Sequence, residues 1–264
     1  MTLNALLALG LALLLSAGER RALSLSLTAL SPEAKPWDQE VKEEEEAADE
    51  EHLDNSPPST PVLPAALFFR AKYQCSAVMV SERWVLTAAH CRRPRFWVRA
   101  GSQLRFSGRL FPHPNFTSAG PSGPHDNDLM LLRLWRPLQG VGPQPLALPS
   151  VCPGPWSRCS LASWTPGPRG QRAPLSIPSP LICNNDCRSL LGSGVTENML
   201  CAAPLSGSRE TCQGNSPGEP LLCDGQLYGL VSWGGQPCPS PKSPGVFTSI
   251  CKFLDWIQET MRNN

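Results

Sequence analysis

The sequence predicts an all-β protein, either a barrel or a sandwich, that ends in one helix. Short apolar runs of strand length recur from Leu67 onward, and turn residues separate them at short intervals. The chain has 29 prolines in 264 residues, about twice the usual share, which favours short strands and fixed loops over long helices. Its length allows one sizeable domain or two small ones.

Five runs have the length and composition of strands: 75–80, 84–88, 96–100, 129–134 and 227–233. The tail, 252–262, has helical periodicity instead, because Phe253, Trp256, Ile257 and Thr260 recur at the spacing of one helix face. No other segment predicts a helix.

The first sixty residues predict a signal peptide and an unfolded acidic leader. Residues 5–15 are apolar and precede Ser16-Ala17-Gly18, so 1–18 has the length of a signal peptide and is too short to span a bilayer. Residues 19–61 are acidic and rich in proline, a composition that cannot bury enough apolar surface to fold. This leader is either a solvated linker or an acidic arm that contacts the basic domain or another basic partner.

The balance of acidic and basic side chains also changes at the end of this leader. Residues 1–60 carry 12 acidic and 4 basic side chains, whereas 61–264 carry 10 acidic and 19 basic ones. An acidic leader is therefore joined to a basic folded part, which we expect to span 62–264.

Eleven cysteines predict a disulfide framework in an oxidising compartment. The alternative is a zinc site, but the cysteines lack paired CxxC knuckles, so we expect neither a metal nor a cofactor. No later segment is long and apolar enough for a membrane anchor. These features predict a secreted, extracellular protein.

Three motifs carry the side chains that serine-based acyl transfer requires: a base, an acid that orients it and a nucleophile. His90, the candidate base, lies between Trp84-Val85-Leu86-Thr87-Ala88-Ala89 and Cys91. Asp128, directly before an apolar run, is the candidate acid, with Asp126 as the alternative. Ser216, within Cys212-Gln213-Gly214-Asn215-Ser216-Pro217, is the candidate nucleophile.

These motifs resemble those of trypsin-like serine peptidases, in which histidine, aspartate and serine follow in this order. Other segments are similar to tissue kallikreins: Phe111-Pro112-His113-Pro114, Asn198-Met199-Leu200-Cys201 and Asp255-Trp256-Ile257-Gln258. The resemblance covers about residues 62–264. It implies two six-stranded Greek-key barrels, a C-terminal helix and hydrolysis of peptide bonds.

The resemblance also implies binding roles. The N–H groups of Gly214 and Ser216 would form the oxyanion hole. Glu210, six residues before the serine, would lie at the base of the specificity pocket and attract Arg or Lys; otherwise it is a solvated glutamate. The pocket walls would contain Ser232, Gly234 and Gly245.

Disulfide pairing is implied by the resemblance as well. The expected pairs are Cys75–Cys91, Cys152–Cys251, Cys159–Cys223, Cys187–Cys201 and Cys212–Cys238. Cys183 is left over, either as a buried free thiol or as an intermolecular link.

The chain departs from the family in the residues that activate the family's members. Cutting after Lys or Arg frees an Ile or Val amine, which pairs with the aspartate before the serine. Here that aspartate is Asn215, and no Lys or Arg lies between Lys42 and Arg70 to provide the cut. Both halves of the switch are therefore missing.

The serine loop departs too. Pro217 replaces the glycine after the serine and disfavours the α region for Ser216. One extra residue separates Cys212 from Cys223, so counting from Cys212 places Ser216 at the nucleophile and counting back from Cys223 places Pro217 there. Ser163-Trp164-Thr165 also replaces the usual Gly-Trp-Gly.

Two functions follow. The first is a secreted trypsin-fold homologue that is inactive or weakly active and binds a protein, a peptide or an inhibitor. The second is an endopeptidase that cuts after Arg or Lys. We expect a monomer that binds no nucleic acid and is glycosylated at the sequon Asn115-Phe116-Thr117. Six arginines form a solvated basic face or contact heparin-like polyanions: Arg92, Arg93, Arg95, Arg99, Arg105 and Arg109.

Overall fold

The computed structural model describes residues 62–120, 123–138, 144–166, 172–204, 216–235 and 238–264. All of them lie in one compact unit, Pro58–Asn264. The expected signal peptide and leader lie outside the described residues. The described part of the chain contains no helix that is long and apolar enough to cross a membrane.

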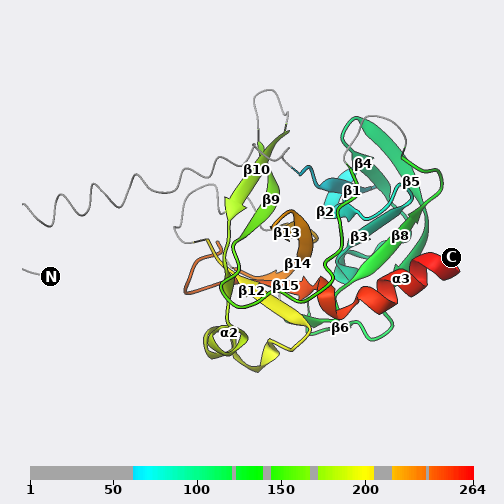
Figure 1. Cartoon of the computed structure of the whole chain (residues 1–264). Helices are drawn as coiled ribbons and strands as arrows, with labels where there is room; N and C mark the ends of the chain where they lie inside the picture. The colour runs from blue at the N-terminus through cyan, green and yellow to red at the C-terminus, as the bar shows by residue number, and fades with distance from the viewer. Residues whose placement is uncertain (1–61, 121–122, 139–143, 167–171, 205–215, 236–237) are drawn as a thin grey trace, which may run out of the picture. The chain divides into compact units, whose positions relative to one another are not determined.

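The first half of this unit is a closed antiparallel barrel of six strands, drawn in cyan to green in Figure 1. Hydrogen bonds connect the strands in the order β1-β2-β3-β8-β5-β4. Alternate side chains point inward, and Leu67, Val85, Val98 and Leu132 are completely buried in its core. The strands are β1 (Ala65–Phe69), β2 (Lys72–Met79), β3 (Trp84–Thr87), β4 (Trp97–Ala100), β5 (Gln103–Pro112) and β8 (Met130–Leu134).

The second half is a seven-stranded antiparallel sheet in the order β10-β9-β13-β14-β15-β12-β11. The expected all-β class and paired barrel-like sheets are confirmed, but this sheet has seven strands where six were expected, because the two-residue β11 adds to its edge. The strands are β9 (Cys159–Pro166), β10 (Arg172–Pro178), β11 (Leu181–Ile182), β12 (Met199–Ala202), β13 (Pro220–Cys223), β14 (Gln226–Gly234) and β15 (Gly245–Ser249).

Short elements connect and cover the two sheets. The pair β6 (Thr117–Ser118) and β7 (His125–Asp126) forms a separate two-stranded ribbon. Helix α2 (Asn184–Leu191) was missed from the sequence, because its eight residues, NNDCRSLL, carry more polar than apolar side chains. Within the described residues the chain also forms the helical turns η1 (Ala89–Cys91), η3 (Gly192–Gly194) and η4 (Ile250–Lys252).

The expected C-terminal helix is present as α3 (Leu254–Asn263), the red ribbon in Figure 1. Ile257 is fully buried, and Trp256 and Met261 pack on the same cluster. That cluster contains residues of both halves, including Leu86 of β3 and Leu230 of β14. The helix therefore covers the seam between the two halves.

Four disulfides brace the fold at expected places: Cys75–Cys91, Cys152–Cys251, Cys159–Cys223 and Cys187–Cys201. Cys238 is disulfide-bonded too, and its expected partner, Cys212, lies outside the described residues. Cys183 is free and half-buried, so it is more exposed than the buried thiol expected from the sequence.

Candidate active site

His90 is held at the seam by the short turn η1, which the Cys75–Cys91 disulfide ties to β2. Its Nδ1 atom lies 2.7 Å from Asp128 Oδ2, and its backbone N–H donates to Asp128 Oδ1 at 2.9 Å. The carboxylate thus accepts from both the ring and the backbone of one residue. It fixes the imidazole with a proton on Nδ1, which leaves Nε2 as an acceptor.

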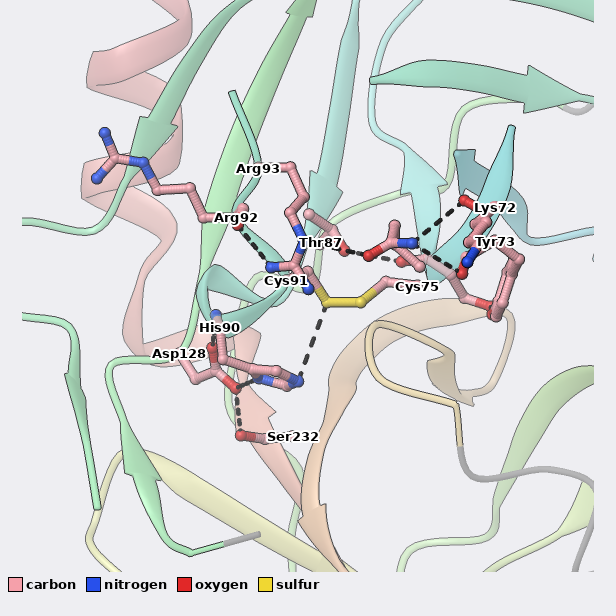
Figure 2. The surroundings of a disulfide bond; sticks show 12 residues. Lys72, Tyr73, Cys75, Thr87, His90, Cys91, Arg92, Arg93, Asp128 and Ser232 are labelled. Carbon is pink, nitrogen blue, oxygen red and sulfur yellow. Dashed lines mark hydrogen bonds and ion pairs between the residues drawn. A yellow bond between two sulfur atoms is a disulfide. The ribbon is translucent and has the colours of Figure 1, made fainter. Parts of the chain in front are cut away.

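Asp128 is completely buried two residues before β8 begins, and the second half of the fold supplies its other partners. The Ser232 hydroxyl of β14 donates to Oδ2, and the Thr248 hydroxyl of β15 donates to the Asp128 carbonyl at 2.9 Å. Figure 2 shows Ser232, Asp128 and His90 connected by these bonds beside the Cys75–Cys91 disulfide. A buried carboxylate needs such donors, since burial without them would be costly.

Asp126, the alternative acid, has a different task. Its Oδ1 accepts from Thr196 Oγ1 at 2.9 Å and from Asn198 Nδ2 at 3.1 Å, just before β12. It therefore ties β7 to the second half of the fold, while Asp128 is the carboxylate bonded to His90.

His125 adds a ring to the site that the sequence motifs did not indicate. It is 3% exposed and stacks on His90 with ring centroids 4.6 Å apart. Burial lowers its pKa below the ordinary value; the Asp128 charge opposes this shift, and His90 adds to it. Its Nδ1 has no hydrogen-bond partner among the described residues. His125 therefore presents a neutral ring beside His90 at neutral pH.

Ser216 stands at the first position of a tight turn. The Glu219 N–H donates to the Ser216 carbonyl at 3.1 Å, and Gly218 has a φ of +80°. Proline at the second position and glycine with positive φ at the third are typical of a type II turn. The turn contacts the first barrel, because the Ser76 N–H donates to the Pro217 carbonyl at 2.8 Å.

The Ser216 backbone donates inward to a side chain that the sequence motifs also left out. Glu219 Oε2 accepts from the Ser216 N–H at 3.1 Å, and Glu219 Oε1 accepts from the Ser163 hydroxyl at 2.7 Å. In the described part of the chain, no hydrogen bond joins the Ser216 hydroxyl to His90; the ring Nε2 lies 4.0 Å from Cys91 Sγ. Hydrogen bonds thus connect His90, Asp128 and Ser232, and none of those found among the described residues connects Ser216 to them.

The expected pocket residues are only partly described. Gly234 and Gly245 lie opposite each other where β14 pairs with β15, and Gly234 has a φ of +78°. A side chain at Gly234 would meet the Pro244 carbonyl at 2.9 Å, so glycine is required there. Glu210, Gly214 and Asn215 lie outside the described residues.

One cluster of the described residues has the composition of a metal site. Potential ligand atoms of Cys75, His90 and Cys91 lie within 4.8 Å of one another. The two cysteines are joined in a disulfide, however, and thiolates are the cysteine form that binds metals. This cluster therefore does not fit a metal centre.

Comparisons with known proteins agree with the fold described above. The family model described as Trypsin matches residues 55–257. Human Kallikrein-11 is 37% identical over an alignment of 220 residues that covers 76% of this chain and 76% of that protein. Human Kallikrein-9 is 38% identical over an alignment of 225 residues that covers 78% of this chain and 88% of that protein.

Solved structures give the same result. A structure titled as Kallikrein-related peptidase 10 in complex with Zn²⁺ has a TM-score of 0.67 and 35% identity, and covers 76% of this chain and 96% of that one. Mouse neuropsin, described as a serine protease expressed in the limbic system of mouse brain, has a TM-score of 0.67 and 33% identity over 78% of this chain and 97% of its own. The chain belongs to the trypsin family of serine peptidases and is related to the tissue kallikreins.

Proposed function

We propose that this chain is a secreted trypsin-family protein that hydrolyses peptide bonds poorly or not at all and acts by binding. The observation that carries the proposal is the engagement of Ser216. Its N–H donates to Glu219 at 3.1 Å, and its hydroxyl makes no hydrogen bond to His90 among the described residues. An acyl-transfer serine needs that hydroxyl against the base and that N–H free for the oxyanion.

The expected loss of catalytic rate can be estimated. Loss of one oxyanion donor costs roughly 10²–10³ in rate. Loss of the serine–histidine contact removes general-base assistance, which contributes about 10²–10⁴. The two losses act on the same step, so residual hydrolysis would be slow even with His90 and Asp128 in place.

Gly218 in this turn is compatible with both ways of counting the serine loop. Gly218 lies so close to the first barrel that a Cβ would be 2.1 Å from the Ser76 carbonyl, so the residue here must be glycine. The family has glycines one and two residues after its serine. Gly218 therefore fits with Ser216 at the nucleophile position, counting from Cys212, and with Pro217 there, counting back from Cys223. In the count from Cys223 the nucleophile and one oxyanion donor are both lost, because proline has neither a hydroxyl nor an N–H; in the count from Cys212 Ser216 is held as described above.

The partner we propose is an exposed segment of another protein or a peptidase inhibitor. Such a segment would lie along the seam beside His90 and His125, where a half-buried imidazole and a buried one stack. A site that keeps the family's surface but lacks its nucleophile can hold a substrate-like or inhibitor-like loop without cutting it.

A fluorophosphonate probe tests the proposal, because it labels serines that an adjacent base activates. We expect no labelling of the secreted chain under conditions in which an active trypsin-like peptidase is labelled fully. Ser216→Ala and His90→Ala are the matched controls. Labelling that disappears in both variants would contradict the proposal.

A second candidate function is endopeptidase activity after Arg or Lys. The bonds of Asp128 to His90 and Ser232 favour it, because they set the imidazole in the tautomer that a base requires. Specificity for basic residues would depend on Glu210, which lies outside the described residues. A peptide series that varies the residue before the cleaved bond would distinguish this function, since turnover after Arg or Lys alone would support it.

We further propose that residues 1–18 are removed, that 19–61 form the acidic leader and that the mature chain is an extracellular monomer with a glycan on Asn115. Asn115 is exposed in a turn before β6. Sequencing of the mature N-terminus and gel filtration test these proposals.

A heparin-like polyanion is a further proposed partner. Trp135 is 71% exposed, and the outward-facing Arg109 pairs across β5 and β8 with Arg133. Of the six arginines expected on this face, Arg105 is partly occupied by the Pro137 carbonyl at 3.2 Å. Retention on a heparin column well beyond that on a simple cation exchanger would support the contact.

A further inference from the structure

We propose that Glu219, supported by Ser163, is a positioning residue that orders Ser216. It replaces the ion pair that orders the serine loop in the family and that this chain lacks. The inference deepens the proposed function and rests on it, because in the count from Cys212 the N–H that Glu219 holds is one that an oxyanion hole would need. No acidic residue follows the serine in the family's Cys-Gln-Gly-Asp-Ser-Gly-Gly-Pro motif, so this carboxylate is a departure from that motif.

The environment of Glu219 shows why it is more than a solvated side chain. Glu219 is 2% exposed and Ser163 is 0% exposed. A buried carboxylate is costly unless polar groups solvate it. Each Glu219 oxygen accepts a hydrogen bond, Oε1 from Ser163 and Oε2 from Ser216, so both oxygens have a donor.

Ser163 and Glu219, which both depart from the family's motifs, are hydrogen-bonded to each other. Ser163 stands at the first residue of the usual Gly-Trp-Gly, and Glu219 stands in the serine loop, 56 positions away in the sequence. A glycine at 163 would give the carboxylate no hydroxyl, and a glycine at 219 would leave the Ser163 hydroxyl buried without this acceptor. Each polar residue therefore satisfies the other.

The backbone keeps the carboxylate in place. The Gly218 N–H donates to the Val231 carbonyl at 2.8 Å, and the Val231 N–H donates to the Glu219 carbonyl at 2.9 Å. Residues 218 and 219 are thus held on β14, and the Glu219 side chain reaches back to the start of its own turn. Because its anchor is β14, the side chain can order Ser216 without a newly cut N-terminus.

The family achieves this order with a charge pair between two chain segments, and this chain lacks both members of that pair. Asn215 replaces the receiving aspartate, and no Lys or Arg between Lys42 and Arg70 allows the cut. A resident carboxylate three residues after Ser216 gives the loop one fixed state from the moment of folding. In that state the Ser216 N–H points to Glu219 and cannot serve an oxyanion.

Amide hydrogen exchange of Ser216, measured by NMR in the full secreted chain, tests the inference. A hydrogen bond to a charged acceptor corresponds to roughly 10- to 100-fold in the opening equilibrium. We expect Glu219→Ala to speed exchange at Ser216 by about that factor. Ser163→Ala should speed it less, and the double variant should exceed Glu219→Ala by little, since both act on one contact.

Two further variants keep the test decisive. Glu219→Gln retains the shape and one acceptor oxygen, so we expect an intermediate rate even if the alanine variant folds poorly. Ser179→Ala removes another buried serine hydroxyl, 3% exposed, whose bond to the Ile177 carbonyl lies elsewhere. It should leave Ser216 exchange unchanged.

Exchange at Ser216 that stays at the wild-type rate in Glu219→Ala and Glu219→Gln would overturn the inference. An equal acceleration in Ser179→Ala would overturn it too, because the effect would then be general loosening. Fluorophosphonate labelling of the wild-type chain would instead contradict the proposed function. The two readouts therefore separate failure of the positioning role from failure of the binding function.

Discussion

Replacing Gly218 with alanine tests whether the serine turn is pressed against the first barrel. An added Cβ would lie 2.1 Å from the Ser76 carbonyl oxygen and 2.7 Å from Thr87 Oγ1. The first neighbour is backbone in β2 and cannot rotate away, so the turn itself must shift. The backbone φ of +80° adds a second penalty for any residue with a side chain.

The magnitude follows from these two terms. A left-handed conformation costs an L-residue roughly 1–2 kcal/mol. Overpacking a buried site typically costs a further ~1–3 kcal/mol. We therefore expect Gly218→Ala to lower the free energy of unfolding by about 2–5 kcal/mol, and the midpoint of thermal unfolding by about 2–4 °C for each of these kcal/mol.

Gly225→Ala provides the matched control. Gly225 has a φ of +76° in the hairpin between β13 and β14, and no atom lies within 4 Å of the position that an added Cβ would take. It therefore reports the backbone penalty alone, about 1–2 kcal/mol. Guanidinium unfolding of both variants separates the two terms. If Gly218→Ala costs no more than Gly225→Ala, the close contact between the turn and β2 is refuted.

Three other changes test further parts of the structure. His125→Phe removes a titrating ring whose burial lowers its pKa. As pH falls through about 6.5, this histidine binds a proton in the unfolded wild type before it does so in the folded protein. The free energy of unfolding of the wild type should therefore fall between about pH 7.5 and 5.5. Denaturation at both pH values should show a smaller loss in the variant, and an unchanged loss would contradict the assignment. Replacing Cys152 and Cys251 with serine opens a loop with a separation of 99 and should cost about 4–5 kcal/mol of unfolding free energy; an unchanged midpoint would count against the bridge. Asn115→Gln should remove a glycan-sized mass from the secreted protein, and an unchanged mass would exclude occupancy.

The strands were predictable because their signal is local. The run expected at 227–233 is β14, Gln226–Gly234, and the run expected at 129–134 is β8, Met130–Leu134. Each is a run of apolar residues bounded by turn residues, so burial and strand form follow from a few neighbours. The helix α2 was not predictable in this way, since only Cys187 of its eight residues is fully buried.

The same division holds within the site. His90 and Asp128 lie in long motifs, and the motif alone indicated that they belong together. His125 has no such motif, and its stacking on His90 depends on how β7 meets η1 in space. The sequence contains only one signal for it, a histidine three residues before Asp128.

Glu219 explains why a serine in the expected motif is a weak guide to activity. The motif predicted a nucleophile because Ser216 follows Cys212 at the family spacing, and it left open the count from Cys223. Pro217 and Gly218 resolve the local geometry, since a type II turn makes Ser216 the residue before the bend. Glu219 then binds the Ser216 N–H from the other side of that bend.

The Glu219 carboxylate and the Pro217–Gly218 turn both hold Ser216, so removing one of them leaves the other in place. Removing the Glu219 carboxylate frees the N–H but leaves the Pro217 carbonyl bonded to Ser76 and the Gly218 N–H bonded to Val231. The turn would therefore keep Ser216 at its first position. Replacing Glu219 alone should loosen Ser216 without activating it, because the position of the hydroxyl is set by the proline–glycine turn and only the N–H is set by the carboxylate.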